Sequence, residues 1–92
     1  MANLRDEIQS FLYHRFGLDY QKAGQLALEI WERTDGFEKE HLKYWVKDRF
    51  DGEIKELLKE YFGEKVVQNW EEFSKIKQEL KNFLSSFLEE KK

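Results

Sequence analysis

The chain has 92 residues, a formal net charge of −3 and no cysteine. Because ~50–200 residues usually share one hydrophobic core, we expect residues 1–92 to form a single helical domain. The lack of cysteine excludes disulfides, thiolate catalysis and zinc–thiolate sites. The slightly negative charge argues against a surface built mainly for nucleic-acid phosphates, which bind lysine and arginine.

Two helices are predicted in the N-terminal part of the chain. The first follows Asn3, a residue that can cap a helix, and its apolar residues recur at helical intervals: Leu4, Ile8, Phe11, Leu12 and Phe16. Gly17 is expected to end this helix and Asp19 to cap the next. The second helix covers about residues 20–33 and is expected to bury Ala23, Leu26, Ala27, Ile30 and Trp31.

Small residues surround Gly24 in this second helix, because Ala23 and Ala27 are its neighbours on one face. A glycine inside a helix costs about 1 kcal/mol relative to alanine, so it needs a packing reason. We expect a close crossing by another helix of the same chain; a helix of a partner protein is the alternative.

The middle of the chain predicts a third helix over about 38–50 and a fourth over about 53–62. Apolar residues fall on one side of each: Leu42, Trp45, Val46 and Phe50 in the third, and Ile54, Leu57, Leu58, Tyr61 and Phe62 in the fourth. Asp51-Gly52 separates the two patterns and is typical of a loop or of a kink within one helix.

The C-terminal part of the chain predicts one long helix. From Glu64 to about Leu88 the apolar pattern continues unbroken once Asn69 is counted in the series. Such a helix of about 25 residues is ~37 Å long, whereas a globule of this size has a radius of gyration of ~12 Å, so it should overhang the rest. The sequence therefore predicts an all-α fold, a small four- or five-helix bundle with a long C-terminal helix.

No pattern of residues predicts catalysis. Every serine lies inside a predicted helix, and the pair Glu38 and His41, which has the spacing of a carboxylate-bundle metal motif, occurs only once. We therefore expect no enzyme, no catalytic residue, no metal site, no cofactor and no small-molecule ligand. The sequence has neither a signal-peptide pattern nor a long uncharged apolar stretch, so we expect a cytoplasmic protein without a membrane partner.

The favoured function is protein–protein interaction without catalysis, by self-association or by docking a partner through the aromatic-rich C-terminal helix. Four residues are its predicted apolar anchors: Trp70, Phe83, Phe87 and Leu88. Exposed apolar stripes of this kind generally mark partner sites. The opposing interpretation is that the first helix folds back and covers the stripe.

A row of lysines supports an alternative function, a small DNA-binding regulator. Lys39, Lys43 and Lys47 recur at every fourth residue, and Arg49 lies near the end of the row. These side chains would contact backbone phosphates. Acidic residues interrupt the row, and lysine rows most often keep an exposed helix face in solution, so nucleic acid is the less favoured partner.

Overall fold

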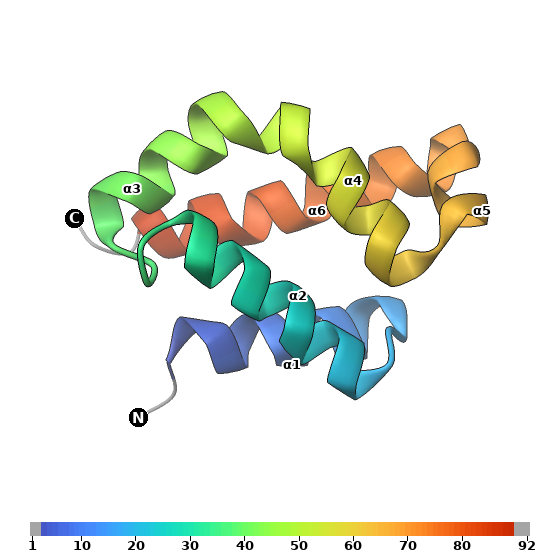
Figure 1. Cartoon of the computed structure of the whole chain (residues 1–92), viewed down its shortest axis with the longest axis horizontal. Helices are drawn as coiled ribbons and strands as arrows, with labels where there is room; N and C mark the ends of the chain where they lie inside the picture. Colours follow the sequence, from blue (N-terminus) through green and yellow to red (C-terminus); the bar gives the residue numbers. More distant parts are fainter. Residues whose placement is uncertain (1–2, 90–92) are drawn as a thin grey trace. The chain divides into compact units, whose positions relative to one another are not determined.

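The computed structural model describes residues 3–89, and all regular secondary structure among them is helical (Figure 1). The elements are α1 (Leu4–Phe16), α2 (Tyr20–Arg33), α3 (Lys39–Tyr44), the π-helical turn η1 (Trp45–Arg49), α4 (Phe50–Phe62), α5 (Glu64–Gln68) and α6 (Trp70–Glu89). Because α3, η1 and α4 follow one another without a break, the described residues form five helices, and α6 is a long one. The predicted all-α class, helix number and long C-terminal helix are confirmed.

The helices group into two compact units, which take in residues 3–38 and residues 39–89 of the described chain. The first unit is a hairpin of α1 and α2 (Figure 1). Asn3 caps α1 by accepting a hydrogen bond of 2.9 Å from the Asp6 N–H, and Asp19 caps α2 through two backbone N–H groups. Gly17 ends α1 in the left-handed conformation with φ 71°. The predicted caps and the predicted end of α1 are therefore confirmed.

The two helices of the hairpin come close together where Gln9 of α1 meets Gly24 of α2. A Cβ atom on Gly24 would lie 2.6 Å from Gln9 Nε2, which donates a hydrogen bond of 3.0 Å to the Tyr20 carbonyl. The predicted crossing by a helix of the same chain is thus confirmed. The buried apolar side chains of the two helices and their turn are Leu4, Ile8, Leu12, Leu18, Ala23, Leu26, Ala27 and Ile30.

Trp31 departs from the prediction that it is buried, since 42% of it is exposed. Its indole ring lies over the turn after α2, with ring atoms 3.6 Å from where a Cβ of Gly36 would stand. The turn itself is left-handed at three successive residues, with φ 53° at Asp35, 75° at Gly36 and 63° at Phe37. Thr34 supports it by accepting a hydrogen bond of 3.1 Å from the Phe37 N–H.

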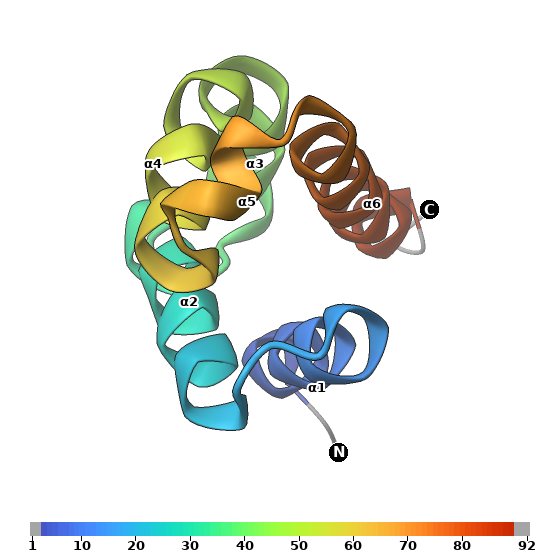
Figure 2. The same ribbon diagram turned by 90° about the vertical axis from the view of Figure 1, so that its right-hand side faces the viewer.

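In the second unit, α3, η1 and α4 form one continuous helix, and α6 packs beside it (Figures 1 and 2). Asp51-Gly52, which the sequence leaves open as a loop or as a kink within one helix, forms no loop, because both residues lie inside α4. The irregularity occurs earlier, at η1, where the Phe50 N–H donates to the Trp45 carbonyl five residues before it. The wide turn keeps Trp45, Val46 and Phe50 all buried, so the helix continues where the apolar pattern shifts.

The predicted single helix from Glu64 to Leu88 is also wrong, because Asn69 interrupts it. Asn69 has extended backbone angles, φ −86° and ψ 103°, between α5 and α6. Its side-chain Oδ1 accepts a hydrogen bond of 3.1 Å from the Glu72 N–H and so caps α6. Asparagine is disfavoured inside helices because its short polar side chain forms hydrogen bonds with the neighbouring backbone. The long C-terminal helix α6 therefore begins after Asn69 and has 20 residues.

Candidate docking groove

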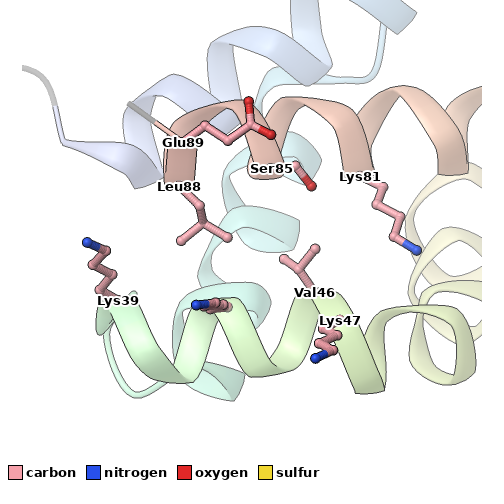
Figure 3. A pocket seen from close by; sticks show the side chains of 8 residues that line it. Lys39, Val46, Lys47, Lys81, Ser85, Leu88 and Glu89 are labelled. Carbon is pink, nitrogen blue, oxygen red and sulfur yellow. The ribbon is translucent and has the colours of Figure 1, made fainter. Parts of the chain in front are cut away.

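A groove lies between α3–η1 and α6 in the second unit (Figure 3). It has a volume of about 580 Å³, and its lining residues are Lys39, Lys43, Val46, Lys47, Lys81, Ser85, Leu88 and Glu89. Each helix contributes four residues at the spacing i, i+4, i+7 and i+8, which is one stripe along a helix surface. The stripe is about 12 Å long at the rise of an α-helix.

The floor of the groove is apolar. The side chains of Val46 and Leu88 extend toward each other from the two helices, and Ser85 points into the same space (Figure 3). Val46 is buried, whereas Leu88 is half-buried. An apolar side chain from another molecule would therefore find apolar contacts there and would remove Leu88 from water.

The rim of the groove is positive. Among the described residues that line it, four are lysines and one is a glutamate, in a chain whose net charge is −3. Lys39, Lys43 and Lys47 are exposed, and no ion pair within residues 3–89 engages them. Since their ammonium groups are not neutralised by the described residues, they are available to carboxylates or phosphates of a ligand.

The fourth lysine is held at one end of the groove. Lys81 Nζ lies 3.7 Å from Asp51 Oδ2 and 5.9 Å from the centre of the Phe50 ring. Lys77 approaches the same carboxylate at 3.5 Å. These contacts join α4 to α6, and partial neutralisation by Asp51 makes Lys81 a weaker anion ligand than the other three lysines.

Lys47 lies in the π-helical turn η1, whereas Lys39 and Lys43 lie in α3. All three line the groove, at the same i, i+4 and i+8 spacing that Lys81, Ser85 and Glu89 have on the regular helix α6.

The structure separates the four predicted apolar anchors. Leu88 lines the groove, and Phe83 and Phe87 are half-buried on the same half of α6. Trp70 is 74% exposed but lies 18 positions before Leu88, which is about 27 Å along the helix. The four residues therefore do not form a single patch, and Trp70, whose ring lies 6.4 Å from that of Phe73, belongs to the opposite end of α6.

The structure also divides the predicted cationic residues. Lys39, Lys43 and Lys47 line the groove together, but Arg49 does not. Instead, Arg49 Nε donates a hydrogen bond of 3.0 Å to Glu53 Oε2 on α4. The structure thus brings the lysine row and Leu88, which the sequence assigns to two different functions, to one site.

Four lining residues are not identified from the sequence as part of any site: Val46, Lys81, Ser85 and Glu89. Val46 was identified only as a core residue. Lys81, Ser85 and Leu88 do share one helical stripe, with spacings of four and three. The stripe indicates a groove only when α6 is known to pack beside α3–η1. The periodicity of a single helix does not show which other helix it packs against.

Two classes of site find no support in the described part of the chain. Within residues 3–89, no cluster of three or more histidine or acidic side chains is placed to bind a metal ion. Across those same residues, no helix combines the length and apolarity needed to cross a membrane. No protein-family model, curated protein or solved structure matches the chain.

Proposed function

We propose that this chain is a non-enzymatic interaction module that docks a partner protein in the groove between α3–η1 and α6. The observation that carries the proposal is the apolar floor of Val46 and Leu88, bordered by lysines without ion pairs among the described residues. Interfaces commonly combine an apolar centre with a charged rim. Phe83 and Phe87 do not line this groove, so of the four predicted apolar anchors Leu88 alone carries the proposal. The cytoplasm is the compartment in which we expect the partner.

The test compares two substitutions on α6. Leu88→Glu places a charge on the groove floor, whereas Ser86→Glu places the same charge on an exposed position two residues away. Each immobilised variant is exposed to extract from the native host, and bound proteins are quantified. We expect Leu88→Glu to lose proteins that the unmodified chain and Ser86→Glu retain. Equal retention by all three, with unchanged circular dichroism, would refute docking in the groove.

Self-association is the other form of this proposal, with a second copy of the chain as the partner. Light scattering at two protein concentrations separates the two forms. A mass that rises with concentration and falls in Leu88→Glu supports a homo-oligomer. A constant monomer mass restricts the proposal to a different protein.

The second candidate function is a small DNA-binding regulator, and the three aligned lysines favour it. With Arg49 engaged by Glu53, the row offers three cations and not four. Three phosphate contacts predict a slope of about −2.7 in a plot of log K against log salt concentration. A duplex titration that shows no binding at low salt would exclude this function.

A further inference from the structure

The groove has the features of a site for one particular kind of segment, and the inference rests on the proposed function. We propose that its occupant is an acidic amphipathic helix of a partner protein, with carboxylates facing Lys39, Lys43 and Lys47 and apolar side chains against Val46 and Leu88. The charge of the rim supplies the first argument. Three exposed lysines at a constant spacing of four residues select an anionic ligand over a neutral or cationic one.

Spacing supplies the second argument. Lysines four residues apart are separated by about 6 Å along the axis of their helix. A helix lying along the groove presents Asp or Glu at its own i, i+4 and i+8 positions with the same separation. The stripe of about 12 Å matches just over two turns, which is the length over which three such pairs form.

The backbone of the ligand supplies the third argument, because it separates a helix from an extended peptide. An extended strand needs partners for its N–H and C=O groups, and among the described lining residues Ser85 is the only one with an uncharged polar side chain. A helix satisfies its backbone internally. Nucleic acid fits less well, since its phosphates would reach the lysines while nothing apolar covers Leu88.

The experiment uses a fluorescein-labelled peptide of about 15 residues, long enough to form a helix when bound. It carries glutamate at every fourth position of one face and leucine on the adjacent face. One control peptide has lysine in place of each glutamate, and a second has a central proline that prevents a continuous helix. Binding to the full chain is measured by fluorescence anisotropy, with a duplex DNA of random sequence as a further ligand.

The protein variants are two triple charge reversals with the same net charge. K39E/K43E/K47E reverses the rim of the groove, and K55E/K59E/K65E reverses exposed lysines on α4 and α5 that do not line it. We expect the acidic peptide to bind the rim variant at least about tenfold more weakly, and the control variant within about twofold of the unmodified chain. The lysine peptide should gain affinity for the rim variant.

Several outcomes would overturn the inference. It fails when both triple variants lose the acidic peptide equally, when the proline peptide binds as well as the helical one, or when the duplex binds more tightly than the peptide. Its failure is distinguishable from failure of the proposed function. Loss of the host partner in Leu88→Glu, with full retention in K39E/K43E/K47E, would leave groove docking intact and reject the acidic helix.

Discussion

The indole Nε1 of Trp45 donates a hydrogen bond of 2.8 Å to Oε1 of Glu53, which lies eight residues further along the same continuous helix. The bond spans the π-helical turn η1 and holds an indole that is only 2% exposed. Arg49 donates to the other oxygen of the same carboxylate at 3.0 Å. Glu53 therefore accepts hydrogen bonds from a buried donor and from a surface donor, and Arg49 reaches it at the ordinary i, i+4 spacing of a helix.

We expect Glu53→Ala to destabilise the fold by about 1–3 kcal/mol, because it leaves the buried indole N–H without its acceptor. Arg49→Ala should cost less than about 1 kcal/mol, since the Arg49 side chain is 58% exposed and surface ion pairs contribute little. Urea denaturation followed by tryptophan fluorescence measures both, with Glu56→Ala as the control on an exposed face. Equal effects of Glu53→Ala and Glu56→Ala would contradict a stabilising role for the bond.

Gly17 and Gly52 both follow a predicted helical pattern in the sequence, but replacing each by alanine should change the stability of the fold in opposite directions. Gly52 lies inside α4 with nothing within 4 Å of an added Cβ, so Gly52→Ala should stabilise the fold by about 1 kcal/mol through helix propensity. Gly17 also has open space, but its φ of 71° disfavours a Cβ, and Gly17→Ala should destabilise by about 1 kcal/mol.

Thermal unfolding by circular dichroism distinguishes the two glycine substitutions. A change of 1 kcal/mol shifts the melting temperature of a domain of this size by roughly 4–8 °C. The melting temperature should therefore rise for Gly52→Ala and fall for Gly17→Ala. A fall in both would indicate that the helix does bend or open at Asp51-Gly52, as the dipeptide alone suggests.

These glycines illustrate how far the sequence predicts the fold. The positions of α1, α2 and their caps follow from periodicity and from Asn3, Gly17 and Asp19, because each of those signals acts on the adjacent backbone. The sequence does not predict that the helix continues through Gly52. This continuity depends on tertiary burial of Trp45, Val46 and Phe50, which outweighs the cost of about 1 kcal/mol for a glycine inside a helix.

The candidate site was predictable in its parts but not as a whole. The lysine row and the apolar character of Leu88 are visible in the sequence, and each suggested a separate function. That they line one groove depends on the side-by-side packing of α6 with α3–η1. Neither periodicity nor charge specifies which helices pair, so Lys81 and Ser85 could not be assigned.

The contact between Gln9 and Gly24 permits a double-mutant cycle. In the unmodified chain, Gly24→Ala gains about 1 kcal/mol of helix propensity but displaces the Gln9 amide, whose bond to the Tyr20 carbonyl contributes a similar amount. We therefore expect a net change within about 0.5 kcal/mol. In a Gln9→Ala background the clash is gone, and Gly24→Ala should stabilise by about 1 kcal/mol.

Urea unfolding of the four proteins gives the coupling free energy of this pair, expected at about 0.5–1.5 kcal/mol. Additive effects would show that the Gln9 side chain moves aside without cost. The control is a second cycle with Gln25→Ala in place of Gln9→Ala. Gln25 is exposed on α2, so we expect no coupling free energy between Gln25→Ala and Gly24→Ala.

Asn69 lies between α5 and α6 and caps the second of these helices. Asn69→Ala removes the side-chain oxygen that accepts the hydrogen bond from the Glu72 N–H, and loss of such a cap costs about 1 kcal/mol. Asn69→Asp keeps the acceptor and places a negative charge at the start of α6, where the helix dipole favours it, so its stability should equal or exceed that of the unmodified chain. Gln68→Ala, at the exposed end of α5, is the control.

Alanine also has the highest helix propensity, which gives the Asn69→Ala experiment a second possible result. If the Asn69 cap stabilises the start of α6, the Asn69→Ala variant should have lower stability and an unchanged or lower helix content by circular dichroism. A gain in both stability and helix content would instead mean that α5 and α6 merge once the asparagine is gone. Because the apolar pattern runs on through position 69, such a merger would show that this one side chain, and no tertiary contact, separates the two helices.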